Sequence, residues 1–535
     1  DRWEGGGYRS PDRLLAELTE LRDALVADGM ERTAYGEIQG LAWQVETFGF
    51  HTFSLEVRQH SDVHAATLKA LEGGPGWEAT EVSRGVDAGE VIETLRAVRE
   101  IQERFGPGAC RRYIISFTRR ARDVTDVLEL ADHAGLSGKA IDVVPLLETA
   151  DALGGADVLL DELLSDEAYR EHLHARGDHQ EVMLGYSDST KESGALAAAW
   201  LLHGAEAKLA AAAQRHGVRL TLFHGRGGAI GRGGGPMSRA ILSSAPSSLQ
   251  GHLKITEQGE VIADRYANQG IALRHLEQLT NAVLLASSSK HEEAAQTAQL
   301  RGATTINELA ERSAQAYQAL VWQDPAFEEY FVAATPIAEL SGLTLGSRPS
   351  ARGGGRISLE SLRAIPWVFS WSQSRAFLPA WYGLGTAVEA YEAEHGSGST
   401  ERLQDLYRES PFLAGVLDVM EMALAKVDIA VAKRYASLAT GPESERIWEN
   451  IRAEYRRTVA AVLRITGREH LLDATPALQR SIALRNPYVD SLSELQVMLL
   501  SRMRALPDDD PERDRLRRLV QLTVSGVAAG LQNTG

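Results

Sequence analysis

The sequence predicts an α/β fold: a (β/α)8-type barrel, incomplete in this chain, embedded in a predominantly α-helical protein. Three observations predict it. Short apolar runs rich in β-branched residues alternate with segments of helical periodicity through the first half of the 535 residues. Six such units follow one another without an obvious reversal, which favours a barrel over a doubly wound sheet. Helical periodicity then dominates from Leu273 onward. We therefore expect barrel units in residues 1–265 and a mainly helical region in residues 266–535.

Each element of the first half has a local signal. The segment from His51 to Val57 alternates apolar and polar residues, as a half-buried strand does, and Tyr113 to Phe117 is a short apolar run. The expected strands span residues 51–57, 113–117, 140–146, 182–186, 218–223 and 253–256. The expected helices, from apolar spacing near 3.6 residues, span 14–27, 41–48, 88–105, 123–134, 158–176 and 193–216. A barrel needs eight strands, so the missing ones are expected upstream of Asp1 or among segments not recognised.

Amphipathic patterns predict the helices of the second half, over residues 278–289, 306–324, 401–407, 413–435, 447–466, 495–500 and 516–531. Trp367 and Trp371 stand four residues apart and are expected in the core rather than in a ligand pocket.

Composition narrows the function classes. Apolar residues make up 44% and charged residues 24%, as in soluble globular proteins, and the net charge of −17 disfavours nucleic-acid and anionic-membrane partners. The single cysteine, Cys110, excludes an internal disulfide and suits a reducing cytoplasm. No apolar run reaches the length of a membrane span. The first residues carry neither an initiator methionine nor a signal peptide, which indicates part of a longer protein or a processed chain.

Polar residues follow the predicted strands where a barrel gathers its chemistry, at the carboxyl ends of the strands. The residues concerned are Arg58, Glu148, Asp188, Lys191, His224 and Arg226.

The stretch from Phe223 to Pro236 is the most unusual in the chain, with seven glycines and two arginines in fourteen residues. Glycine lets a ligand approach backbone N–H groups, and arginine presents a planar fork that matches phosphate and carboxylate oxygens. The stretch therefore predicts an anion-binding turn. A flexible surface loop is the alternative. The spacing fits neither a Walker loop nor a dinucleotide fingerprint.

Glu148 and Asp188 are two carboxylates at neighbouring predicted strand ends, and Mg²⁺ is commonly bound by one or two carboxylates with substrate oxygens and water. The alternative is that each caps a helix or pairs with an arginine.

Lys191 stands in a Ser/Thr segment before a helix. A lysine there can hold an anion, and the alternative is an exposed lysine without a ligand. A second cationic stretch, Leu345 to Arg356, predicts either an anion site or a solvated basic loop.

The glycine–arginine stretch resembles the signature of phosphoenolpyruvate carboxylase. Other segments resemble the same family in the same order: residues 145–149, 185–191, 346–349, 362–367, 484–488 and 532–535. The resemblance covers essentially the whole chain but not the whole family protein. The family's catalytic histidine stands in a Thr-Ala-His-Pro-Thr motif, and none of the 15 histidines here precedes a proline. The chain thus resembles the carboxyl-terminal portion of a bacterial-type enzyme.

The resemblance implies roles for particular residues. Glu148 and Asp188 would bind Mg²⁺ or Mn²⁺. The implied catalytic residues are Lys191, Arg58, Arg226, Arg348 and Arg363, with Gly225, Gly227 and Gly228 in the substrate loop. The implied site for a dicarboxylate inhibitor, aspartate or malate, consists of Arg232, Lys426, Arg485 and Asn533. Thr190 and Glu192 depart from the family segment around Lys191.

The implied activity is that of a carbon–carbon lyase that joins phosphoenolpyruvate and bicarbonate to give oxaloacetate and phosphate, an anaplerotic step of carbon dioxide fixation that feeds the tricarboxylic acid cycle. A cytoplasmic, allosteric homotetramer is implied as well. The isolated chain is expected to show little or no carboxylation. The alternatives are another phosphoenolpyruvate-handling barrel enzyme and a non-catalytic fragment that binds dicarboxylates or forms an assembly. An RNA-binding Arg-Gly role is disfavoured, because the stretch is single and the protein is acidic.

Overall fold

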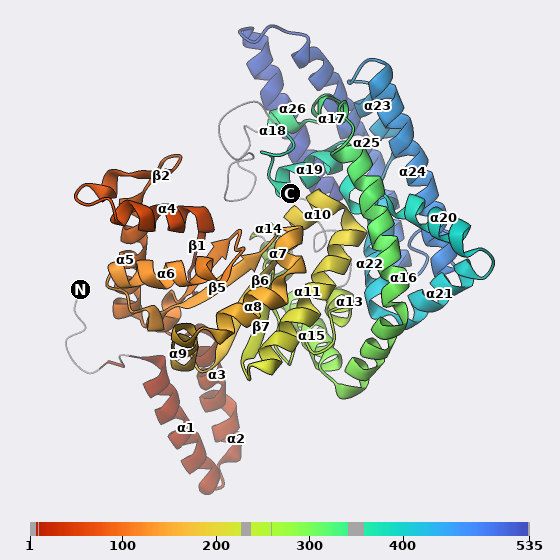
Figure 1. Cartoon of the computed structure of the whole chain (residues 1–535). Coiled ribbons are helices and arrows are strands. Elements are labelled where there is room, and N and C mark those ends of the chain that lie inside the picture. Colours follow the sequence, from red (N-terminus) through yellow and green to blue (C-terminus); the bar gives the residue numbers. More distant parts are fainter. Residues whose placement is uncertain (1–6, 9, 226–236, 258, 341–357, 533–535) are drawn as a thin grey trace. The chain divides into compact units, whose positions relative to one another are not determined.

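The computed structural model describes residues 7–8, 10–225, 237–257, 259–340 and 358–532. Helices make up most of it (Figure 1). Backbone contacts divide the chain into two compact units, Asp1–Leu146 with Glu162–Glu181, and Leu147–Asp161 with Val182–Gly535. Among the described residues, every helix is too short or too polar to cross a bilayer.

The main sheet confirms the predicted fold class, an incomplete α/β barrel in a helical protein. Its six strands form a curled parallel sheet in the order β1-β4-β5-β6-β7-β8. Three of the strand pairs have a defined register. Arg58 of β1 lies opposite Ile114 of β4, Ile114 lies opposite Val144 of β5, and Phe223 of β7 lies opposite Lys254 of β8. The strands are β1 (Glu56–His60), β4 (Arg112–Ser116), β5 (Asp142–Leu147), β6 (His179–Gly185), β7 (Arg219–Gly225) and β8 (Lys254–Ile255).

The first unit packs amphipathic helices against its strands. Helix α5 buries Val91, Ile92, Leu95 and Val98, which share one helical face. The helices are α1 (Pro11–Ala27), α2 (Glu31–Thr33), α3 (Gln39–Phe48), α4 (Ser61–Leu71), α5 (Ala88–Phe105), α6 (Ala121–His133) and α9 (Glu167–Ala175). Shorter elements are the π-helical turn η1 (Ala34–Ile38), the single turns η2 (Trp77–Ala79), η3 (Pro107–Ala109) and η4 (Gly138–Ala140), and the antiparallel pair β2 (Glu81–Ser83) and β3 (Val86–Asp87).

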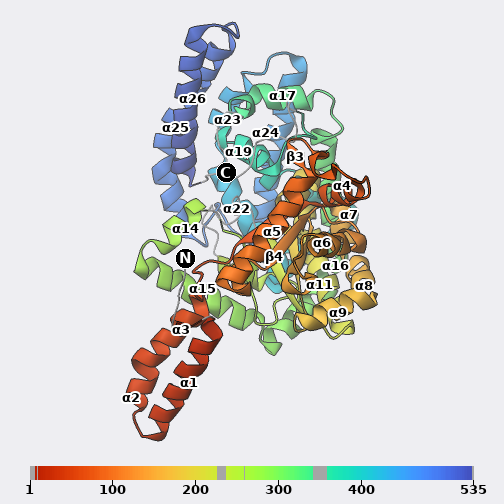
Figure 2. The same cartoon turned by 90° about the vertical axis from the view of Figure 1, so that its left-hand side faces the viewer.

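The second unit has a large aromatic core. Trp367 and Trp371 are fully buried, as predicted, with ring centroids 5.7 Å apart and planes nearly perpendicular. Helices α25 and α26 lie side by side (Figures 1 and 2). The first helices after β5 are α7 (Ala150–Gly154), α8 (Ala156–Ser165, which continues into the first unit), α10 (Ser187–Ser193), α11 (Ala195–Arg215), α13 (Met237–Leu242), α14 (Gly259–Tyr266), α15 (Gln269–Ala286), α16 (Ser289–Val321), α17 (Phe327–Ala334) and α18 (Ile337–Leu340). The remainder are α19 (Ala364–Gln373), the turn η5 (Leu378–Ala380), α20 (Leu384–His395), α21 (Ser399–Glu409), α22 (Pro411–Lys426), α23 (Ile429–Ala436), α24 (Pro442–Thr466), α25 (Pro476–Arg504) and α26 (Pro511–Leu531).

Two expected helices prove to be pairs of helices, because an aspartate starts a new helix inside each. Asp166 accepts a hydrogen bond from the Tyr169 amide (2.8 Å) and divides residues 158–176. Asp428 accepts one from the Val431 amide (2.9 Å) and divides residues 413–435.

Other expectations differ from the structure as well, and two of them concern the site. The first strand spans Glu56–His60 rather than 51–57, because its pairing partners on β4 begin opposite Glu56. Arg58 therefore lies inside β1 and not beyond its end. The Ser/Thr segment that carries Asp188 and Lys191 is the helix α10 and not a loop.

Candidate active site

Glu148 follows directly after β5 and is buried, with 4% of its surface exposed. Its position is defined by the end of the neighbouring strand β6. A Cβ atom on Gly185, the last residue of β6, would stand 2.4 Å from the Cβ of Glu148. Only glycine permits this approach, since real contacts of that kind are far longer. The backbone of β6 thus ends in contact with the residue that carries the predicted metal carboxylate.

Helix α10 begins two residues after Gly185 and carries Asp188 and Lys191, which are three residues apart and so share one helical face. Asp188 lies in the first turn, where the helix dipole favours a negative charge. Glu192 accepts a hydrogen bond from the Ala150 amide (3.2 Å) and joins α10 to the start of α7. The structure therefore brings together the segments of Glu148 and Asp188.

The Lys191 ammonium is buried and donates to two backbone carbonyl groups, those of Leu359 (2.5 Å) and Leu362 (2.6 Å). Arg363 follows directly and stands at the N-cap position of α19. The Tyr317 hydroxyl holds the other side of α10 by donating to the Lys191 carbonyl (3.0 Å). Lys191 thus ties the helix of Asp188 to the turn of Arg363.

His224, the penultimate residue of β7, lies in a buried polar cluster. Its Nδ1 lies 2.7 Å from the Tyr186 hydroxyl and 3.6 Å from Oε1 of Glu206. Glu206 comes from the alanine-rich helix α11 and accepts from the Ala245 amide (2.8 Å). Periodicity could identify Glu206 only as a carboxylate on a buried helical face. This cluster fixes the end of β7, immediately before the glycine–arginine stretch.

Gly225 leaves room for β6. A Cβ atom there would lie 2.8 Å from the Leu184 carbonyl oxygen. The other glycine-loop residues and several arginines lie outside the described residues: Arg226, Gly227, Gly228, Arg232, Arg348 and Asn533. Arg58 lies in the first unit, where its Nε donates to the Ser116 hydroxyl (3.4 Å).

Two residues of the predicted inhibitor site lie close together in the second unit. Lys426 ends α22 and is buried, and its pKa is lowered to about 8 by burial and by the charge of Arg485. Arg485 on α25 donates to the carbonyls of Ser481 and Gly530, each at 3.1 Å, and burial lowers its pKa as well. Two positive charges withdrawn from water in this way would be stabilised by a bound anion.

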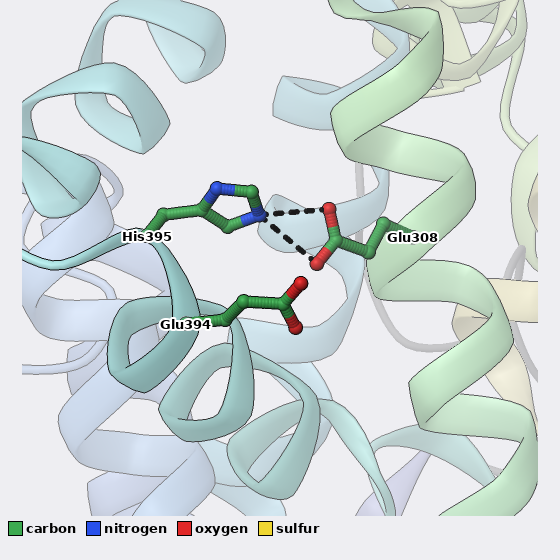
Figure 3. A group of neighbouring side chains, drawn as sticks. All are labelled: Glu308, Glu394 and His395. Atoms are coloured by element: carbon green, nitrogen blue, oxygen red, sulfur yellow. Dashed lines mark hydrogen bonds and ion pairs between the residues drawn. The ribbon is translucent and has the colours of Figure 1, made fainter.

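Among the described residues, one group of three has ligand atoms within 4.8 Å of one another, close enough for a metal: Glu308 on α16 with Glu394 and His395 on α20 (Figure 3). The His395 Nε2 lies 3.0 Å from Glu308. Arg312 neutralises both carboxylates, since its Nη2 donates to Glu308 (2.7 Å) and to Glu394. This group is therefore an ion-pair network. Glu148 and Asp188 remain the predicted ligands of a divalent cation, because carboxylate oxygens suit Mg²⁺.

A sequence profile of the family described as "Phosphoenolpyruvate carboxylase" matches residues 2–79 and 75–535. Curated relatives carry the same description. The protein from Roseiflexus castenholzii is 41% identical over 569 residues, covering 99% of this chain and 60% of the relative. Those from Azoarcus sp. and Thermosynechococcus vestitus are each 40% identical, covering 61% and 56% of the relative. The chain thus spans about 60% of the length of these relatives.

Proposed function

The chain belongs to the phosphoenolpyruvate carboxylase family, and from that premise we propose that its protein carboxylates phosphoenolpyruvate with bicarbonate to give oxaloacetate and phosphate. One observation carries the proposal. The hydrogen bond from Lys191 Nζ to the Leu362 carbonyl (2.6 Å) joins the helix of Asp188 to the turn of Arg363. A helix that carries a carboxylate for a cation is thereby joined to a turn that carries a guanidinium for an anion, which supports a site for a phosphorylated acid with a bound metal.

Glu148 and Asp188 would hold Mg²⁺ or Mn²⁺ in this proposal. The donor set fits, because both ligands are carboxylates and Glu148 is withdrawn from bulk water. When bound, the ion supplies Lewis acidity that neutralises phosphate and enolate oxygens.

The reaction proceeds in two stages. A bicarbonate oxygen attacks phosphorus, the bond from phosphorus to the enol oxygen breaks, and carboxyphosphate and the enolate of pyruvate form. Carboxyphosphate then releases carbon dioxide and phosphate, and the enolate carbon attacks carbon dioxide to form the new carbon–carbon bond. Arg363 stabilises the charge on the transferring phosphoryl group, with Arg58, Arg226 and Arg348 assigned by their matching family positions. The buried surroundings of Lys191 limit water near the enolate.

The regulatory part of the proposal is that aspartate or malate binds Lys426 and Arg485, with Arg232 and Asn533 completing the site. The lowered pKa of Lys426 supports it, because a bound anion would offset the free-energy cost of burying two positive charges near each other. We further propose a cytoplasmic homotetramer whose product enters the tricarboxylic acid cycle.

A second candidate is a non-catalytic dicarboxylate-binding or assembly fragment, and one observation favours it: the buried Lys426 lies within the field of a second cation, Arg485. One set of measurements on the 535-residue chain separates the candidates. Calorimetry with Mg²⁺ should detect phosphoenolpyruvate binding that Glu148→Gln with Asp188→Asn abolishes, while a malate dehydrogenase-coupled assay should show little turnover. Aspartate binding without metal-dependent phosphoenolpyruvate binding would establish the second candidate. Phosphate release without bicarbonate would instead indicate another phosphoenolpyruvate-handling barrel enzyme.

A further inference from the structure

Arg504, the last residue of α25, makes a bidentate ion pair with Glu339 in α18. Its Nε and Nη2 each stand 2.9 Å from a different carboxylate oxygen of Glu339, which is buried. The same guanidinium donates to the carbonyls of Ala333 (2.6 Å) and Thr335 (2.8 Å). These four hydrogen bonds hold the end of α17 and Glu339 of α18 against the end of α25.

Helix α18 packs against α19, the helix that begins directly after Arg363. Leu340 of α18 shares one buried core with Leu362 and Trp367. Because packed cores transmit displacement rather than absorb it, a shift of α18 moves the start of α19. Lys191 holds the same turn from α10 through the Leu362 carbonyl (2.6 Å). The turn of Arg363 thus has two cationic anchors, one of them direct and the other acting through α18.

We propose that Arg504 is a positioning residue that fixes α18 on Glu339 and thereby sets the position of Arg363. The identity of the ligand rests on the function proposed above, whereas the coupling between Arg504 and Arg363 rests on geometry alone. Arginine is required because only a planar guanidinium can meet both carboxylate oxygens and two carbonyls together. A lysine keeps the charge but offers a single nitrogen.

The test is phosphoenolpyruvate binding to the 535-residue chain by calorimetry in Mg²⁺. Arg504→Lys should weaken binding about tenfold, since a displacement near 1 Å at a binding group is costly. Arg457→Lys is the matched control, because Arg457 also pairs with a buried glutamate, Glu454 (2.8 Å), within the same unit. The control should change affinity less than about twofold.

A double-mutant cycle distinguishes positioning from a general structural role. In an Arg363→Ala background, Arg504→Lys should cost less than about twofold further, because the group through which it acts is gone. Additive losses, or an equal loss in the Arg457→Lys control, would overturn the proposal. Should Arg504→Lys not fold, Glu339→Gln breaks the same pair from its other side and carries the same expectations.

Hydrogen exchange decides the coupling independently of any ligand. Arg504→Lys should accelerate exchange in α18 and at the Trp367 amide, which donates to the Arg363 carbonyl (3.2 Å). Acceleration confined to α18 would overturn the proposal, whether or not phosphoenolpyruvate binds. Absence of binding to the unsubstituted chain, by contrast, would count against the proposed function alone.

Discussion

Gly185→Ala should disturb the candidate metal site without touching a charged group. The added Cβ would lie 2.4 Å from the Cβ and 2.9 Å from the Cα of Glu148. Carbon atoms rest at about 3.5 Å or more, so β6 or Glu148 must move by about 1 Å. Neither atom is the end of a flexible side chain, and overpacking of this kind costs about 1–3 kcal/mol of unfolding free energy.

The displacement should also weaken divalent-ion binding, because ligand oxygens tolerate shifts of only about 0.5 Å. We expect at least about a tenfold loss of Mn²⁺ affinity, measured as the stabilisation of thermal unfolding across a Mn²⁺ titration. Gly204→Ala is the matched control. Gly204 lies inside α11 with no atom within 4 Å of an added Cβ, and alanine there should stabilise by about 0.5–1 kcal/mol. Wild-type stability and an unchanged Mn²⁺ response in Gly185→Ala would refute the reasoning.

Three further predictions concern charged and titrating groups. In the fold the pKa of Lys426 is about 8, against an ordinary value of 10.5. Between these pH values the unfolded chain binds more protons than the folded chain, so the free energy of unfolding should rise from pH 8 to 10.5. Lys426→Met should flatten this rise and raise the free energy of unfolding at pH 7 by on the order of 1–3 kcal/mol, measured by denaturant titration. Arg485→Ala should weaken aspartate binding at least about tenfold by calorimetry, and unchanged binding would remove it from the inhibitor site. Burial and nearby His60 lower the pKa of His64 to about 3, so the free energy of unfolding should fall as the pH drops below 6.5. His64→Gln keeps a partner for the Tyr113 hydroxyl and should reduce that loss. An acid-unfolding curve identical to that of the unsubstituted chain would contradict this expectation.

Local signals in the sequence were enough for most of the elements. Helix α5 begins and ends where its amphipathic pattern does, at Ala88 and Phe105, because Gly106 at φ 90° stops it. The strand boundaries were less accurate. Phe53 and Leu55 look like strand residues but are exposed, and the strand begins only at Glu56, where β4 offers hydrogen-bonding partners. Pairing partners distant in sequence decide such boundaries, and periodicity does not contain them.

The same limit applies to the site. The position of Glu148 at a strand end follows from the pattern of apolar runs alone. The carbonyl partners of Lys191 lie 168 and 171 residues further along the chain, and Glu339 lies 165 residues from Arg504. No local rule connects residues at such distances, so their roles become visible only when the packing of α10, α18 and α19 is known.

The glycines at the strand ends lie where the sequence predicts them, but their role in packing could not be predicted from the sequence. The glycine–arginine pattern predicts ligand approach at Gly225, and Gly185 belongs to a segment that resembles the family. In the fold neither has a positive φ, so neither is needed for an unusual backbone conformation. Each leaves space for a neighbour, the Leu184 carbonyl at Gly225 and the Glu148 side chain at Gly185. Missing side chains let adjacent strands approach closely at their carboxyl ends, and Glu148, a carboxylate of the proposed site, lies at that edge.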